Sequence, residues 1–184
     1  YTKTKSLGVY DINDNLLEKH EEEEFYLKID DIIDQYDVVI TVDYGHGLLT
    51  PKIINQIENK SRYLALNTQM NSFNIGHHTI SKYSDVNYVC VHEGELRNDY
   101  RDHNNNIENL TKNLSKRINA EVIVITKGNE GSLVYDNNDF INCPAYAGKV
   151  VDRIGAGDTL LAITSLCFAV GMPKDLTLFI GNLA

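Results

Sequence analysis

Apolar and polar positions follow two different periods along this chain. Short apolar runs rich in β-branched residues predict buried strands, and the strongest runs cover residues 37–43 and 120–128. Longer segments with apolar residues at helical spacing predict helices between them. The pattern predicts strands at 6–11, 37–43, 62–67, 85–91, 120–128, 131–136 and 139–143, and helices at 28–36, 105–119 and 157–171, with others beginning at Pro51, Glu93 and Pro173.

Turn and capping residues support these boundaries. Thr50 is an expected N-cap, with Pro51 at the first helical position, where a missing N–H costs nothing. Gly171 is expected to end the helix over 157–171. The polar turn at 137–139 separates two short strands and predicts a hairpin.

Strands and helices alternate, which predicts an α/β fold with a mostly parallel sheet covered by helices on both faces. In such sheets ligands bind beyond the carboxyl ends of the strands. The loops that follow strands are therefore the candidate ligand loops, and they are 43–47, 67–78, 92–95, 126–131 and 152–158.

Composition and charge narrow the class of protein. The chain has 184 residues, 42% of them hydrophobic, which is enough for the core of one domain. The net charge of −9 argues against nucleic acid or an anionic membrane surface as the main partner. No apolar run approaches the roughly 18 residues that a membrane-spanning helix needs. The acidic run at 21–24 is expected on a solvated face or in a loop.

The cysteines point to a reducing compartment. Cys90, Cys143 and Cys167 are an odd number at wide spacing, without a CxxC pair. Neither a disulfide framework nor a zinc site is indicated, so we expect buried thiols and a cytoplasmic protein.

The strongest chemical signal is the run of small residues before Asp158. Gly155, Ala156 and Gly157 open a predicted helix, where unpaired backbone N–H groups and the helix dipole attract an anion. Asp158 lies one residue inside that helix, where a carboxylate can accept a proton from an attacking hydroxyl. An anion hole beside a base predicts phosphoryl transfer. These four residues alone are equally compatible with a tight turn followed by an ordinary first-turn acid.

The surrounding residues add a family resemblance. The segment 152–162 resembles the C-terminal motif of the ribokinase-like (PfkB) carbohydrate kinases, Asp-Thr-x-Gly-Ala-Gly-Asp, with Arg153 in place of the Thr. The segment 122–136 resembles that family's strand–turn–strand with Thr-x-Gly-x-x-Gly. Two more segments, 43–50 and 91–96, resemble motifs of the heptose-phosphate kinase branch. The matching residues of these three segments are Thr126, Gly128, Gly131, Asp43 and Glu95, and the departures are His46 for Lys and His92 for Asn.

The resemblance implies a three-layer α/β/α ribokinase-like fold that uses ATP and Mg²⁺ to phosphorylate a sugar or sugar phosphate. Asp158 would be the catalytic base, and Gly155 to Gly157 the anion hole. Asp152 would support that loop, with a monovalent cation as an optional further cofactor.

The resemblance also assigns the other ligand sites. His92 and Glu95 would lie at the ATP phosphates, with Glu95 at the magnesium, and the 126–131 loop would contact the nucleotide. Asp43 and Asn67 are the candidate substrate-binding residues. Asn67 begins the amide-rich segment 67–76, which is either the lining of a polar ligand pocket or a long surface loop.

The departures from the family pattern leave a second class of function open. His46 either contacts a phosphate or caps a turn, and the His92 replacement either retunes the phosphate site or marks its loss. The alternative to an enzyme is therefore a non-catalytic kinase-like module that binds a nucleotide or sugar phosphate. A dinucleotide-binding dehydrogenase is disfavoured because no GxGxxG follows the first strand.

Both ends of the sequence look cut within a larger protein. The chain starts at Tyr1 and stops inside an apolar, helix-like pattern. We therefore expect residues 1–184 to form one truncated kinase domain that lacks the family's N-terminal part and lid. The resemblance also allows a homodimer and a fused nucleotidyltransferase domain in the full-length protein.

Overall fold

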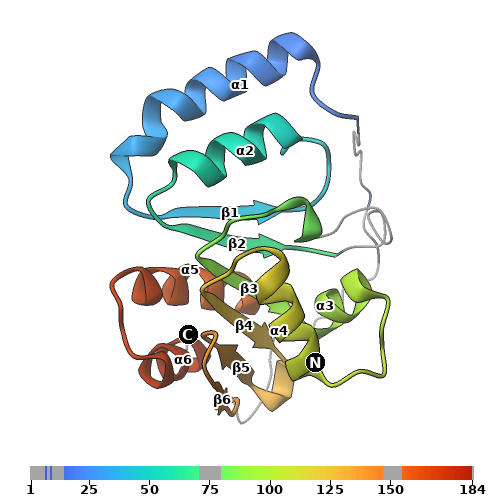
Figure 1. The fold of residues 1–184 in the computed structure, drawn as a ribbon, viewed down its shortest axis with the longest axis vertical. Helices are drawn as coiled ribbons and strands as arrows, with labels where there is room; N and C mark the ends of the chain where they lie inside the picture. Colours follow the sequence, from blue (N-terminus) through green and yellow to red (C-terminus); the bar gives the residue numbers. More distant parts are fainter. Residues whose placement is uncertain (1–6, 8, 10–14, 71–79, 147–154, 184) are drawn as a thin grey trace.

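The computed structural model describes residues 7, 9, 15–70, 80–146 and 155–183 (Figure 1). The predicted strand 6–11 lies largely outside these residues. One sheet contains β1 (Val39–Asp43), β2 (Leu64–Thr68), β3 (Tyr88–His92), β4 (Val122–Thr126), β5 (Ser132–Tyr135) and β6 (Phe140–Cys143). The helices are α1 (Lys19–Ile32), α2 (Pro51–Lys60), α3 (Glu93–Tyr100), α4 (Ile107–Arg117), α5 (Ala156–Ala169) and α6 (Lys174–Leu183), and short 3₁₀ turns occupy Ile33–Gln35, Ile80–Lys82 and Gly128–Glu130.

The strands lie side by side in sequence order. β1 to β4 are parallel, whereas β5 and β6 are antiparallel and form the predicted hairpin at one edge. The helices that connect the parallel strands all lie on the same face of the sheet, as right-handed crossovers in a single direction require. The mostly parallel sheet predicted from the sequence is confirmed.

Two apolar clusters divide the helices between the faces of the sheet (Figure 1). The larger cluster joins α2, α3 and α4 to β2, β3 and β4, and α1 packs against its outer side. The smaller cluster joins α5 and α6 to the opposite face through side chains such as Leu161, Leu178 and Tyr88. The molecule therefore has three layers. No helix within the described ranges is long and apolar enough to cross a membrane.

The predicted helix boundaries hold where a cap was expected. The Thr50 side chain accepts a hydrogen bond from the backbone N–H of Ile53 at 3.4 Å, and Pro51 is the first residue of α2. Gly171 takes a left-handed conformation with φ 73° just after α5, as the end of a helix favours. Local side-chain chemistry is sufficient to place both boundaries.

The N-terminal helix departs from the expected pattern. α1 begins at Lys19 and is continued by a 3₁₀ turn, so the prediction of a helix over 28–36 was wrong at its start. The acidic run 21–24 lies inside this helix, largely on its exposed side. The sequence analysis missed the start because α1 has no fully buried residue and hence only a weak apolar stripe.

Polar contacts stabilise α1 instead. The carboxylate of Glu21 accepts the backbone N–H of Glu18 at 2.9 Å, which closes a capping box at the helix start. Asp30 accepts bonds from Lys60 and Gln56 of α2, at 2.5 and 2.9 Å. Such contacts between helices depend on tertiary packing and leave no periodic signal in the sequence.

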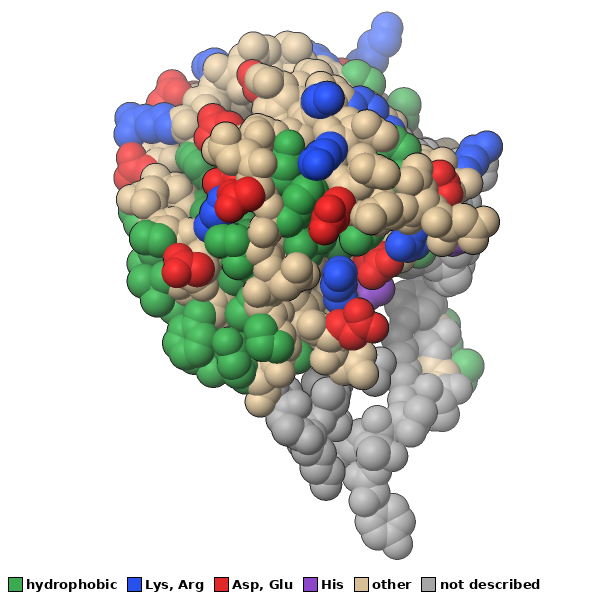
Figure 2. Space-filling view, turned by 60° about the horizontal axis from the view of Figure 1, so that its bottom comes forward, with side chains coloured by type: hydrophobic (Ala, Val, Ile, Leu, Met, Phe, Trp, Pro, Cys, Tyr) green, Lys and Arg blue, Asp and Glu red, His purple; other side chains and the backbone are tan. Residues whose placement is uncertain are grey.

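Apolar side chains are exposed over α5 and α6. Figure 2 shows a gathering of them at the lower left of the molecule. The large exposed apolar residues of these two helices are Leu166, Leu176, Phe179 and Leu183, and Val170 directly after α5 adds to them. Contiguous apolar surface of this kind is typical of a face that contacts further protein.

Candidate active site

The carboxyl ends of the parallel strands meet at one edge of the sheet. Asp43 at the end of β1 is in register with Thr68 of β2, and His92 at the end of β3 is in register with Thr126 of β4. Residues from separate candidate ligand loops therefore lie together, as expected for a parallel sheet.

Helix α5 begins with an open backbone. Gly155 is its N-cap with φ 83°, a conformation that glycine adopts without strain. The first bond inside the helix runs from the N–H of Thr159 to the carbonyl of Gly155 at 2.9 Å, so the earlier N–H groups have no acceptor within the helix. A Cβ built on Gly155 or Gly157 would meet no atom of the described residues within 4 Å. This start has the room and the donors to bind an anion.

Asp158 lies in the first turn of α5 and is exposed. Its Oδ1 accepts a hydrogen bond from Nε2 of Gln69, just after β2, at 2.8 Å. The adjacent Met70 N–H donates to Oε1 of Glu95 at 3.1 Å. The consecutive residues Gln69 and Met70 thus connect Asp158 with Glu95 through two hydrogen bonds.

Glu95 is held at the start of α3. Its Oε2 accepts the backbone N–H of His92 at 2.7 Å, which forms half of a capping box. Burial raises the pKa of the Glu95 carboxyl, opposed by the N–H groups of His92 and Met70, and the nearby Asp158 charge raises it further. Glu95 and Asp158 are therefore close enough to repel each other, and a cation between them would relieve that repulsion.

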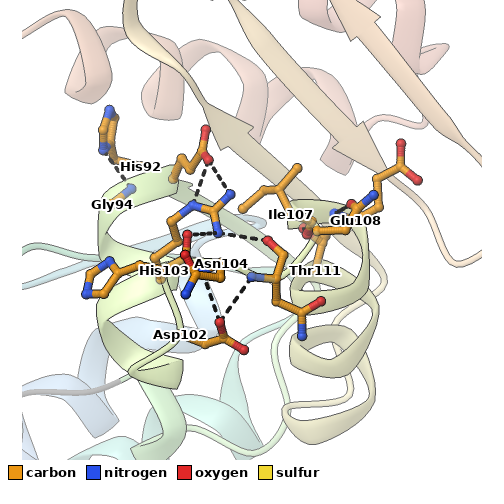
Figure 3. A network of polar contacts seen from close by, with 12 residues as sticks. His92, Gly94, Asp102, His103, Asn104, Ile107, Glu108 and Thr111 are labelled. Carbon is orange, nitrogen blue, oxygen red and sulfur yellow. Dashed lines mark hydrogen bonds and ion pairs between the residues drawn. The ribbon is translucent and has the colours of Figure 1, made fainter.

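His92 performs the other half of the same capping box. Its Nδ1 accepts the backbone N–H of Gly94 at 3.0 Å (Figure 3). An asparagine side chain at an N-cap accepts a backbone N–H in the same way, so the local role of the family's Asn is kept. The bond also assigns the neutral ring proton to Nε2, which can then donate to a ligand.

We expect different effects from two substitutions of His92. His92→Ala removes the acceptor of the Gly94 N–H and should lower the free energy of unfolding by about 1 kcal/mol. His92→Asn keeps an acceptor and should lower it by less than about 0.5 kcal/mol. Urea denaturation of both variants checks this, and equal losses would show that the cap contributes nothing.

A polar network steadies the far end of α3. Arg97 donates to Glu93 within the helix, at 2.7 Å, and to the carbonyl groups of His103 and Asn105. Asp102 accepts the N–H groups of the turn that follows (Figure 3). The helix that carries Glu95 is therefore braced at both ends.

The loop between β4 and β5 is a tight turn at the same edge of the sheet. The N–H of Lys127 donates to the carbonyl of Gly131 at 2.8 Å, and the N–H of Gly131 to the carbonyl of Gly128 at 3.1 Å. Gly131 has φ 92°, and a Cβ there would lie 2.0 Å from the carbonyl oxygen of Cys143. Packing alone therefore requires glycine at 131.

Asp43 is placed inside the protein rather than at the surface. Its carboxylate accepts the Tyr83 hydroxyl at 2.7 Å and the Gly45 N–H at 2.9 Å, and pairs with Lys82 at 2.5 Å. Burial, reinforced by the Asp43 charge, raises the pKa of the Tyr83 phenol, so this hydroxyl stays a donor. Asp43 fixes the loop after β1 to the 3₁₀ turn before β3, and its role toward a substrate stays a prediction.

Asn67 and His46 lie on neighbouring loops. Nδ2 of Asn67 donates to the carbonyl of Cys90 at 2.7 Å, whereas its buried Oδ1 has no donor among the described residues. The His46 ring stacks on Tyr44, with the ring planes 11° apart. Asp152 lies outside the described residues.

The sequence alone did not indicate the residues that connect the predicted ones. Gln69, Lys82 and Tyr83 contact Asp158 or Asp43, and none was a candidate. The amide-rich segment 67–76 was the available signal for Gln69, because the lining of a polar ligand pocket was one of its two interpretations. A pocket at its start is lined by Thr68, Gln69, Met70, Ile80, Val91, Glu95, Leu96, Asn98, Asp99 and Leu114.

Metal-binding side chains do not form a complete site in the part of the chain that the structure describes. No group of three His, Cys, Asp or Glu side chains is arranged there to hold an ion. Magnesium commonly takes one or two carboxylates and completes its shell with phosphates and water. Glu95 alone is thus compatible with Mg²⁺ carried by a nucleotide.

The family model for the pfkB family carbohydrate kinases matches residues 50–184. The chain belongs to the pfkB family. The match includes the α5 start, Glu95 and the 126–131 loop, which the sequence analysis assigned to the family on separate motifs.

Comparison with curated proteins and solved structures agrees with this membership. The bifunctional protein HldE of Campylobacter fetus is 30% identical over 167 residues, a match that covers 85% of this chain and 34% of the relative. Phosphofructokinase-2 of Escherichia coli in complex with potassium matches with a TM-score of 0.75 at 13% identity, over 92% of this chain and 55% of that one. Arabidopsis thaliana ribokinase complexed with ribose and ATP matches with a TM-score of 0.65 at 15% identity, over 92% and 52%.

These likenesses confirm the three-layer ribokinase-like fold. The chain spans about a third of the length of this curated relative and about half of each kinase structure.

Proposed function

We propose that the protein transfers the γ-phosphoryl group of ATP to a hydroxyl group of a sugar or sugar phosphate. The observation that carries the proposal is the start of α5, where backbone N–H groups after the glycine N-cap have no acceptor within the helix and lie beside the exposed carboxylate of Asp158. Donors aimed at a phosphoryl group, next to a base aimed at a hydroxyl, are what this reaction needs.

On the acceptor side, Asp158 orients the sugar hydroxyl and accepts its proton as the oxygen attacks phosphorus. The N–H groups of Gly155, Ala156 and Gly157 stabilise the charge on the transferred group. Asn67 is the proposed sugar contact because its buried Oδ1 has no donor among the described residues, and a sugar hydroxyl would supply one.

On the nucleotide side, Nε2 of His92 donates to a phosphate and Glu95 holds magnesium directly or through water. Thr126, Gly128 and Gly131 belong to the loop proposed to approach the nucleotide. A monovalent cation near Asp152 is proposed by analogy with the phosphofructokinase-2 structure that contains potassium.

The relatives suggest the wider context of the protein. The complex of phosphofructokinase-2 with fructose-6-phosphate supports a sugar phosphate as acceptor. The bifunctional HldE supports a second domain in the full-length protein, for which the family resemblance implies a nucleotidyltransferase. A homodimer and a cytoplasmic location stay predictions. A non-catalytic module is the second candidate, motivated by the departures at His46, His92 and Arg153, but the preserved cap at His92 favours the enzyme.

The proposal is tested with the full-length protein, ATP, magnesium and a panel of hexose and heptose phosphates. We expect ADP release that depends on one of these acceptors, and magnesium-dependent binding of a non-hydrolysable ATP analogue with micromolar affinity, a typical range for kinases. Binding without transfer to any acceptor would favour the non-catalytic module. Absence of both would contradict a nucleotide site at this edge of the sheet.

A further inference from the structure

Gln69 lies where the proposed base and Glu95 approach each other. Its amide donates to Oδ1 of Asp158 at 2.8 Å, across 89 positions of sequence. The next residue, Met70, donates its N–H to Glu95. Among the described residues, Gln69 provides the one side chain that hydrogen-bonds the Asp158 carboxylate.

The backbone that carries Gln69 is fixed on both sides. Its own N–H donates to the carbonyl of Asp43 at 2.9 Å, and the Met70 N–H is held by Glu95. The Asp43 carboxylate is in turn buried and bonded to Tyr83. A half-buried side chain on such a support points in a defined direction, which is what placing another group requires.

The Asp158 carboxylate needs such a partner. It is exposed, and the neighbouring Ala156 and Gly157 offer no bulky side chain against which it could pack. Glu95 lies on the other side of Gln69 and accepts the N–H of the next residue, Met70. An amide donor at Oδ1 fixes the plane of the carboxylate and leaves Oδ2 for the acceptor hydroxyl.

We infer that Gln69 is a positioning residue for the phosphoryl-transfer step, acting through Asp158. The inference rests on the proposed function. It concerns the side chain of Gln69 and not the fold of the loop after β2. The backbone N–H groups of Gln69 and Met70 hold that loop.

Three variants of the full-length protein separate the effect of the hydrogen bond that Gln69 donates from the effect of its side-chain shape. Gln69→Ala removes the donor and should lower kcat about tenfold, the value of one charge-assisted hydrogen bond at an exposed site. Gln69→Glu keeps the shape but replaces the donor by a like charge, and should lower kcat by about 100-fold. Gln69→Lys keeps a donor of similar reach and should stay within about threefold of the wild type. The KM values for ATP and sugar should change less than about twofold, because ground-state contacts are untouched.

Gln35→Glu is the matched control. Gln35 is exposed in the 3₁₀ turn after α1 and donates to the carbonyl of Asp31, so the same charge change occurs away from the site. We expect wild-type kcat for this variant, and thermal unfolding midpoints within about 2 °C for all variants.

The outcomes distinguish this inference from the function on which it rests. If Gln69→Glu and Gln69→Lys have equal kcat, or if the loss appears in KM alone, Gln69 is not a positioning residue while the kinase proposal stands. If the wild type transfers no phosphoryl group, the proposed function fails and the inference with it. A lower kcat in Gln69→Ala and Gln69→Glu, with near wild-type kcat in Gln69→Lys, supports both the positioning role and the kinase proposal.

Discussion

Replacing Asp158 by Asn is expected to lower kcat for phosphoryl transfer by about 10³-fold, within the range that a general base contributes. The amide has nearly the same shape but cannot accept the proton of the attacking hydroxyl. The KM for ATP should stay within about threefold, because the open N–H groups at the start of α5 belong to the backbone and are kept. Steady-state kinetics with the acceptor found by the panel measure both quantities.

Asp175→Asn is the control for that substitution. Asp175 is an exposed acid in the first turn of α6, so the change of charge and the position in a helix are the same. It should leave kcat within about twofold. Unchanged activity of the Asp158→Asn enzyme would show that Asp158 is not the catalytic base. The glycine run would then be an ordinary helix start.

Replacing Gly131 by Ala is expected to lower the free energy of unfolding by about 3 kcal/mol or more. The new Cβ would lie 2.0 Å from the carbonyl oxygen of Cys143 and 2.6 Å from backbone atoms of Pro144 and Ala145. Backbone atoms cannot rotate away as a side chain can, so β6 itself would have to move. The backbone conformation, with φ 92° and ψ −134°, adds strain for any residue with a side chain.

Gly128→Ala in the same turn separates the cost of a positive φ from the cost of a steric clash with the new Cβ. Gly128 also has a positive φ, of 59°, but no atom of the described residues lies within 4 Å of a Cβ built there. Its substitution should cost about 1 kcal/mol, the usual cost of the left-handed conformation. Urea denaturation of the two variants measures the difference, and equal losses would show that the contact with β6 relaxes freely.

The two glycines of the Thr-x-Gly-x-x-Gly motif, Gly128 and Gly131, differ in what requires them. The sequence analysis placed Thr126, Gly128 and Gly131 together at the nucleotide, on resemblance alone. The structure gives Gly131 a sufficient reason in packing, whereas Gly128 stays exposed and sterically open. Gly128 is therefore the position where a side chain would test nucleotide approach with little harm to the fold.

The sequence by itself determined the six strands of the described sheet, its mostly parallel arrangement and several helix boundaries. These features depend on local patterns: apolar runs for β1 and β4, the Thr50 cap, and Gly171 after α5. α1 was located poorly for the same reason, since its exposed helix is stabilised by polar contacts with α2 rather than by a buried stripe.

The sequence also indicated the glycine run and Asp158, because both belong to one helix start, and the family resemblance added Glu95. Only the tertiary structure decided what connects them. The amide of Gln69 reaches Asp158, and Lys82 and Tyr83 bury the charge of Asp43, across sequence separations that carry no periodic signal. Such contacts form where neighbouring parallel strands bring their carboxyl ends to one edge of the sheet, and that convergence is a property of the folded chain.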